Sequence, residues 1–193
     1  MTIICLVRHG ETDWNAEGRL QGSMDIPLNQ NGIMQAKACS EHLQEVPWDF
    51  VVTSPLQRAK DTAEIINGNL NLPLIVMDEF MERHFGDAEG MTLEDRRAIF
   101  PDKKYPNQET KLSLNTRLME GIKKINDQFA NSRVLLVAHG AVIDAILNAF
   151  SVGEEETFTR LQNGCISHIH FEQDNWQVKG VNEVSHLLSY PRQ

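Results

Sequence analysis

Arg8 and His9 stand directly after an apolar run, Ile3–Val7, close to the start of the sequence. A short apolar run of this kind predicts a buried strand. Because desolvating an unpaired charge is expensive, a guanidinium and an imidazole at the end of such a strand must reach solvent or share an opposite charge. A neutral imidazole is also a nucleophile near neutral pH, so this stretch is a candidate for the start of a functional site.

Two further apolar runs also end in polar residues. Asp49–Thr53 is followed by Arg58 about one helical turn later, and Val134–Ala138 is followed directly by His139. In an open parallel sheet the carboxyl ends of the strands share one edge, where ligands bind, so both arginines and both histidines are expected to meet there. Grouped cations repel unless an anion joins them, and phosphate accepts hydrogen bonds from several donors. The backbone amides at Gly10 and at the helix start after His139 are expected to add to this phosphate site.

Each of these residues also has a purely structural explanation. Arg8 would form a salt bridge, Arg58 would lie on a solvated helix face, and His9 and His139 would be core imidazoles with satisfied hydrogen bonds. That explanation requires separate coincidences at three strand ends, whereas one bound phosphate accounts for all of them. The sequence therefore favours a phosphate site.

Strand and helix patterns alternate along most of the chain. Further apolar runs predict strands at 72–77, 165–171 and 176–181. Apolar residues spaced three and four apart predict helices near 29–47, 56–68, 92–100, 118–129 and 141–150. Residues 13–27 and 79–90 are expected to be loops. This alternation predicts an α/β fold, a three-layer α/β/α sandwich with a mainly parallel central sheet.

The length and charge of the chain limit its class. With 193 residues we expect one domain spanning 1–193, in which 79–110 form a small cap over the site. The net charge of −9 disfavours nucleic acids and anionic membranes as partners, although a local cationic pocket can still hold a small anion. No apolar stretch approaches the roughly 20 residues of a membrane span, and no basic leader precedes the first strand, so a cytoplasmic protein is expected. The oligomeric state is not readable from the sequence.

Cysteines and paired histidines give no sign of a metal. Cys5, Cys39 and Cys165 are odd in number, far apart and set among apolar residues, so they are expected to be buried free thiols. His168 and His170 share one face of a predicted strand, a spacing found in metal sites. Without an obvious third ligand nearby, structural or surface histidines are the favoured interpretation.

Several motifs together resemble the histidine phosphatase superfamily, the phosphoglycerate mutase-like proteins. They are Leu6–Thr12 followed by Asn15, Gln21, Gly22 and Asp25–Leu28; Ser54–Ala63; Glu82–Gly86 with Glu89 and Gly90; Val137–Gly140; and the closing Asn182–Leu187. They cover nearly the whole chain in the order that the family shows, so a chance match is very improbable.

This resemblance implies a covalent mechanism in which His9 attacks phosphorus and becomes phosphohistidine. Arg8, Arg58 and His139 would hold the phosphate, and Glu82 would protonate the leaving oxygen and then activate water. A carboxyl in that role needs a raised pKa. The substrate would be a small phosphorylated metabolite, and neither a metal nor a cofactor is implied. Further substrate contacts are expected from Asn15, Gln21, Gly22, Arg83 and Gly140.

Three functions share such a site. The stretch Glu82–Gly86 is close to the mutase version of its motif, which favours a cofactor-dependent phosphoglycerate mutase. Mutases of this family carry a longer insertion before the last histidine, however, and only 91–133 separate the two motifs here. A small cap admits water, so a phosphatase acting on small phosphomonoesters is the favoured prediction. A non-catalytic phospho-ligand binding module is disfavoured, because such proteins usually lose the nucleophile or the acid.

Overall fold

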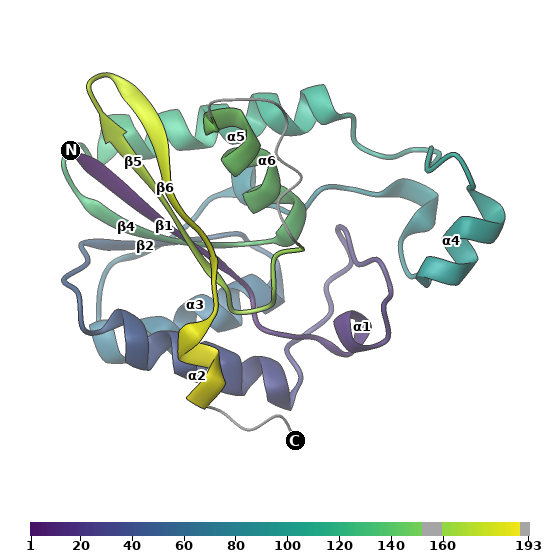
Figure 1. The fold of residues 1–193 in the computed structure, drawn as a ribbon, viewed down its shortest axis with the longest axis horizontal. Helices are drawn as coiled ribbons and strands as arrows, with labels where there is room; N and C mark the ends of the chain where they lie inside the picture. Colours follow the sequence, from purple (N-terminus) through teal and green to yellow (C-terminus); the bar gives the residue numbers. More distant parts are fainter. Residues whose placement is uncertain (152–159, 190–193) are drawn as a thin grey trace.

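The computed structural model describes residues 1–151 and 160–189 of the chain. Its strands form one six-stranded sheet in the order β3-β2-β4-β1-β5-β6 (Figure 1). The strands are β1 (Thr2–Arg8), β2 (Phe50–Thr53), β3 (Leu74–Val76), β4 (Arg133–Ala138), β5 (Ile166–Glu172) and β6 (Asn175–Glu183). β1 to β4 pair in parallel, whereas β5 and β6 add to the sheet in antiparallel fashion. The predicted mainly parallel sheet is confirmed.

Helices cover both faces of this sheet. They are α1 (Asp13–Ala16), α2 (Gln30–Leu43), α3 (Gln57–Leu70), α4 (Leu93–Ile99), α5 (Lys111–Gln128) and α6 (Gly140–Phe150), with 3₁₀ turns at Asp78–Phe80, Gly86–Ala88 and Ser185–Ser189. α2 and α3 lie on one face, and α5 and α6 on the other (Figure 1). The three-layer α/β/α sandwich is therefore confirmed.

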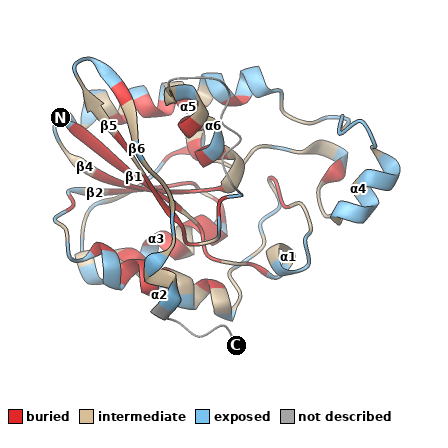
Figure 2. Ribbon diagram, in the orientation of Figure 1, coloured by how far each residue is buried: buried red, intermediate tan, exposed pale blue. Residues whose placement is uncertain are grey.

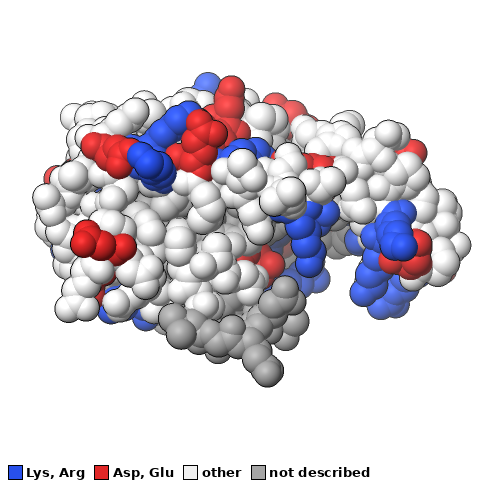
Figure 3. All heavy atoms as spheres, turned by 90° about the horizontal axis from the view of Figure 1, so that it is seen from above, with Lys and Arg blue, Asp and Glu red and all other residues white. Residues whose placement is uncertain are grey.

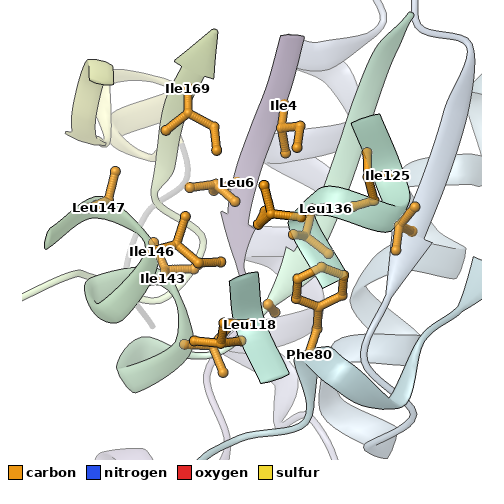
Figure 4. Close-up of a cluster of buried hydrophobic side chains, with 14 of the residues drawn as sticks. Ile4, Leu6, Phe80, Leu118, Ile125, Leu136, Ile143, Ile146, Leu147 and Ile169 are labelled. Carbon is orange, nitrogen blue, oxygen red and sulfur yellow. The ribbon is translucent and has the colours of Figure 1, made fainter. Parts of the chain in front are cut away.

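The two central strands, β1 and β4, carry apolar side chains on both faces. Leu6 pairs with Leu136 in the sheet, and both point into the core beneath α5 and α6 (Figure 4). The next positions, Val7 and Val137, join the core on the side of α2 and α3. A strand buried on both faces reads as an unbroken apolar run, which is why these strands were predictable. Cys5, Cys39 and Cys165 are buried free thiols, as expected.

The chain between the first motif and α2 is not a simple loop. The predicted loop at 13–27 begins with the short helix α1, which Thr12 caps by accepting a hydrogen bond from the backbone N–H of Asn15, while the Asn15 side chain reaches back to the Thr12 amide. This reciprocal capping box supports a single turn without any apolar periodicity. The loop prediction was wrong there.

Several predicted boundaries also differ. α2 ends at Leu43 instead of near Pro47, and its last turn is capped by the Trp48 indole, which donates to the Leu43 carbonyl at 2.8 Å. α3 continues past Gly68 to Leu70 and ends where Asn71 adopts a left-handed conformation, φ 52°. A glycine is tolerated inside a helix at a modest cost, and asparagine can replace it as the left-handed cap.

Residues 79–110 begin in the core, where Phe80 is buried against α5, and continue into a lobe beside the helical layers. It contains the predicted short helix, α4, which projects at the right of Figure 1 and is largely exposed in Figure 2. None of the helices in the described part of the chain is long and apolar enough to span a membrane.

Candidate active site

His9 is buried at the carboxyl end of β1, with both ring nitrogens assigned by their partners. Nδ1 lies 2.7 Å from the Gly10 carbonyl oxygen, and the Arg58 Nε–H donates to Nε2 over 3.3 Å. A carbonyl only accepts and a guanidinium only donates, so Nδ1 carries the proton and Nε2 carries a lone pair. The nitrogen free to act as a nucleophile therefore faces a cation.

The loop after His9 is held from three sides. The Gly10 amide donates to Thr62 Oγ1 of α3 at 3.1 Å, and the Asn163 side chain donates to the His9 carbonyl at 3.1 Å. On the third side a Cβ on Gly10 would lie 2.3 Å from the Gly32 carbonyl oxygen, so α2 packs directly on this backbone. The position of the imidazole is thus fixed by contacts distant in sequence.

The four predicted cations and imidazoles do meet. Arg58 is fully buried and donates to the carbonyl oxygens of Gly22 and Met24, each at 2.8 Å. The ring centroids of His9 and His139 lie 5.2 Å apart. Arg8, His9 and Arg58 line one cavity of about 150 Å³. The carboxyl ends of three parallel strands bring them together, as expected from the sheet.

Two of these groups keep a buried nitrogen without a partner among the described residues: Arg8 Nε and His139 Nδ1. The other His139 nitrogen, Nε2, lies 2.7 Å from Ser54 Oγ. An unpaired buried donor is costly, and it is a group that a bound anion can satisfy. Arg8 Nε and His139 Nδ1 can therefore donate hydrogen bonds to an anion.

Two of the backbone amides at the positions expected to bind phosphate already have hydrogen-bond partners. The Gly10 amide is bonded to Thr62, and the Ala141 amide, in the first turn of α6, donates to Glu82 Oε2 at 3.3 Å. Because each N–H makes one strong hydrogen bond, side chains rather than these amides remain available for the anion.

Glu82 lies in the wall of the same cavity as Arg8 and Arg58, although it is distant from both in the sequence. Its Oε1 accepts a hydrogen bond from the Arg83 amide at 2.8 Å. Burial raises the pKa of this carboxyl above its ordinary value, although the two amide bonds and the charges of Arg58 and Arg8 oppose the increase. A carboxyl with a raised pKa next to a nucleophile is suited to proton transfer.

Arg117 of α5 fixes the backbone that carries Glu82. Its Nη1 donates to the carbonyl oxygens of Glu79 at 2.6 Å and Met81 at 2.8 Å, while Nε and Nη2 bind the Glu109 carboxylate at 2.8 and 2.9 Å. No sequence pattern singled out Arg117 or Asn163, because both act through contacts with distant backbone. Ser54 and Thr62 lie inside a recognised motif, yet their partners were not predictable.

The predicted substrate contacts divide into two groups. Asn15, Gln21 and Gly22 line the cavity. Arg83 does not, because its guanidinium donates to the Glu109 carbonyl at 3.0 and 2.9 Å. Gly140 lies behind the Arg8 guanidinium, where a Cβ would approach Nε to 3.4 Å. Arg83 and Gly140 thus do not line this cavity, whose wall also contains Arg19, Arg96 and Arg160.

Each of the two histidines on β5 lies near a carboxylate. His168 lies 4.0 Å from the Glu183 carboxylate, and His170 lies 3.6 Å from Glu172. Across residues 1–151 and 160–189, the structure contains no cluster of three side chains able to hold a metal ion.

Both site imidazoles are neutral at neutral pH. Burial lowers the pKa of His9 well below its ordinary value of 6.5, and the charges of Arg58 and Arg8 lower it further. The pKa of His139 is lowered in the same way, by burial first and then by Arg58. A neutral His9 has its Nε2 lone pair available.

These shifts predict a stability that decreases as the pH falls through 6.5. Below that value the unfolded chain protonates His9 and His139 while the folded chain does not, so each histidine lowers the free energy of unfolding by at most about 1.4 kcal/mol per pH unit. Glu82 acts with the opposite sign, because its raised pKa favours the folded state at acid pH and that contribution is lost as the pH rises.

Urea unfolding of the wild type and of His139→Gln at pH 7.5 and 5.5 isolates the histidine contribution, because Glu82 is common to both proteins. The wild type is expected to lose more stability than the variant between the two pH values. Equal losses would show that His139 does not titrate in the way its burial requires.

Comparison with known proteins shows to which family the chain belongs. Residues 4–184 match the model of the histidine phosphatase superfamily (branch 1). The chain is 52% identical over 191 residues to the uncharacterized phosphatase PhoE of Bacillus subtilis (strain 168), covering 98% of this chain and 99% of that one. It is 33% identical to a metal-independent phosphoserine phosphatase of Arabidopsis thaliana, over 98% of this chain and 84% of the other.

Solved structures agree with the sequence relatives. The structure of Bacillus stearothermophilus YhfR superposes with a TM-score of 0.90 and 28% identity, covering 97% of this chain and 100% of that one. A match of the family model over most of the chain, together with the same fold, leads to one assignment. The chain belongs to branch 1 of the histidine phosphatase superfamily.

Proposed function

We propose that this protein is a phosphatase that hydrolyses small phosphomonoesters through a phosphohistidine on His9. The observation that carries the proposal is the unprotonated His9 Nε2. The Gly10 carbonyl accepts the hydrogen bond of Nδ1, which leaves the Nε2 lone pair facing Arg58 in a cavity shared with Glu82. A nucleophile, a cation and a proton donor on one small cavity are the parts that phosphoryl transfer needs.

The reaction takes place in two steps. In the first, the Nε2 lone pair of His9 forms a bond to phosphorus, the bond from phosphorus to the ester oxygen breaks, and the Glu82 carboxyl gives its proton to that oxygen. In the second, the Glu82 carboxylate takes a proton from water, the water oxygen attacks phosphorus, and the N–P bond breaks. Inorganic phosphate leaves, and Glu82 is again protonated.

Side-chain donors stabilise the charge on the transferring group. Arg58 donates to His9 Nε2, Arg8 lines the same cavity, and the His139 ring lies 5.2 Å from the His9 ring between centroids. We propose that these three side chains bind the phosphate oxygens. Guanidinium groups supply positive charge and paired hydrogen bonds to phosphate oxygens, so this mechanism requires no metal. Asn15, Gln21 and Gly22 border the same cavity and are proposed to contact the substrate.

Residues 79–110 act in this proposal as a small cap of a single domain, 1–193, which includes the undescribed residues 152–159 and 190–193. Glu89 connects the cap to the body, since its carboxylate accepts hydrogen bonds from the Ser23 amide at 3.0 Å, the Ser23 hydroxyl at 2.9 Å and the Phe85 amide at 2.9 Å. A cap of this size leaves room for water. This favours transfer of the phosphoryl group to water over its transfer back to a bound intermediate, as a mutase would do.

A phosphomonoester panel that includes 3-phosphoglycerate tests the proposal, with inorganic phosphate release and phosphoryl migration measured separately. We expect phosphate release to exceed migration on every good substrate. Fast migration with little release would identify a mutase, which the stretch Glu82–Gly86 resembles. Binding of phosphate without turnover of any ester would identify a binding module.

A further inference from the structure

Ser54 and His139 lie side by side because of the register of the central sheet. β2 and β4 are parallel neighbours in which Thr53 pairs with Val137, and the Ser54 amide donates to the Val137 carbonyl at 3.1 Å. The residues that follow these two strands therefore meet at one edge of the sheet. There Ser54 Oγ lies 2.7 Å from His139 Nε2. Strand pairing thus sets the contact between the hydroxyl and the imidazole.

Both side chains of this pair are fully buried. Figure 3 shows Lys and Arg side chains on both sides of the hollow between the α4 lobe and the rest of the molecule, where water and salt screen their charges. A buried group has no such access to water, so each hydrogen of Ser54 and His139 needs an acceptor within the protein or its ligand.

Two arrangements of the protons fit the contact between Ser54 and His139, because a hydroxyl can donate or accept. In the first, the hydroxyl donates to Nε2, which carries the lone pair, and the ring proton is on Nδ1. In the second, Nε2–H donates to Ser54 Oγ, and Nδ1 carries the lone pair. Burial, followed by the charge of Arg58, lowers the pKa of His139 well below 6.5, so the ring is neutral and takes one of these two forms.

The Leu56 amide favours the first arrangement. It donates to Ser54 Oγ at 3.3 Å. If Nε2–H of His139 donated to the same oxygen, the hydroxyl would accept twice and its own hydrogen would need a further acceptor. Within residues 1–151 and 160–189, Ser54 Oγ has no hydrogen-bond partner besides Leu56 and His139. Because an unpaired buried donor is costly, the hydroxyl is expected to donate to Nε2.

The first arrangement also suits a bound anion. His139 Nδ1 has no hydrogen-bond partner among the described residues. With a proton on Nδ1, the imidazole can donate to a phosphate oxygen, whereas a lone pair at that position would repel the oxygen. The direction of the bond at Nε2 therefore decides whether the other nitrogen attracts or repels phosphate.

We propose that Ser54 is a positioning residue that fixes the proton of His139 on Nδ1 and thereby makes this imidazole a hydrogen-bond donor to the transferring phosphate. The hydrogen bond at one ring nitrogen sets the tautomer at the other. The inference rests on the proposed function in one respect, because it takes phosphate as the ligand of His139. Ser54 does not line the cavity and acts through His139.

Nitrogen-15 NMR of the imidazoles measures the tautomer without turnover. The Hδ2 proton of a histidine couples to Nε2, so a long-range correlation spectrum at neutral pH shows whether Nε2 carries a lone pair. The His139 signals are identified by their loss in His139→Ala. We expect a lone pair on Nε2 in the wild type and a mixture of both tautomers in Ser54→Ala. A protonated Nε2 in the wild type, or the wild-type tautomer in Ser54→Ala, would overturn the proposal.

Thr53→Val is the matched control. It removes a buried hydroxyl from the neighbouring residue, one that donates to the Ser54 carbonyl at 3.1 Å instead of to His139. The tautomer should be unchanged. Calorimetry with inorganic phosphate should show about tenfold weaker binding in Ser54→Ala and less than about a twofold change in Thr53→Val. Equal weakening in both variants would assign the effect to the loss of a buried hydroxyl and would overturn the role of the tautomer.

A double-mutant cycle tests whether Ser54 acts through His139. Ser54→Ala should lower kcat/KM for p-nitrophenyl phosphate by about tenfold in the wild-type background and by less than about twofold in the His139→Ala background. The same loss in both backgrounds would show that Ser54 has a general structural role, and the proposal would be wrong.

These measurements separate the inference from the proposed function. If no ester is hydrolysed, yet Ser54→Ala changes the tautomer of His139 and weakens phosphate binding, the proposed function fails and the role of Ser54 stands. If esters are hydrolysed and the tautomer does not depend on Ser54, the inference fails alone.

Discussion

Replacing His9 with alanine is expected to lower kcat by roughly 10⁴-fold or more for every phosphomonoester, because no other group can form the bond to phosphorus. Gly10 and Arg58 assign the lone pair to His9 Nε2, and burial keeps the imidazole neutral. Loss of the side chain removes this nucleophile but leaves the surrounding arginines in place. Phosphate binding should therefore persist in the variant.

Labelling with a phosphorus-32 ester followed by rapid quenching measures the intermediate directly. The wild type should carry one acid-labile, base-stable phosphoryl group per chain, and the His9→Ala protein none. His42→Ala provides the control, because His42 is an exposed histidine on α2 that stacks on His186 outside the cavity. Labelling that survives in His9→Ala would contradict the assignment of the nucleophile.

Replacing Glu82 with glutamine is expected to separate the two steps of the reaction. Glutamine keeps the shape of the side chain but can neither give nor take the proton, so alkyl phosphates should lose about 10²- to 10⁴-fold in kcat/KM. With p-nitrophenyl phosphate the leaving group departs as a stable anion without protonation. The first step should then survive, while removal of the phosphoryl group by water becomes slow.

Stopped-flow absorbance on p-nitrophenyl phosphate should therefore show a burst of close to one equivalent of p-nitrophenolate in Glu82→Gln, followed by slow turnover. Glu79→Gln is the matched control from the same segment, since Glu79 pairs with Lys124 of α5 and lies outside the cavity wall. The same loss on alkyl and aryl esters, with no burst, would show that Glu82 does not act as the acid.

The pH profile provides a further check on Glu82. Burial raises the pKa of the Glu82 carboxyl, and the negative charge of a bound phosphate dianion would raise it further. Activity on alkyl phosphates should decrease as the pH rises through this pKa. In Glu82→Gln that alkaline decrease should be missing from the residual activity.

The fold and the inner site were largely encoded in local patterns. Ile3–Val7 and Val134–Ala138 read as unbroken apolar runs because β1 and β4 are buried on both faces. Parallel strands place their carboxyl ends at one edge, so Arg8, His9 and His139 had to converge once the sheet was predicted. Sequence alone thus determined the class of fold and which cations and imidazoles meet at this edge of the sheet.

Tertiary structure decided which donors are free and which arginines reach the cavity. Arg83 adjoins the acid in sequence, but the Glu109 carbonyl, 26 residues away, holds its guanidinium, whereas Arg96 of α4 enters the cavity wall. Likewise, the Gly10 amide donates its hydrogen bond to the Thr62 hydroxyl. Periodicity and propensity report which face of an element is buried, whereas hydrogen bonds between distant loops depend on how the complete chain packs. For that physical reason the place of His9 at the end of β1 could be predicted from the sequence, while the hydrogen-bond partners around the cavity could not.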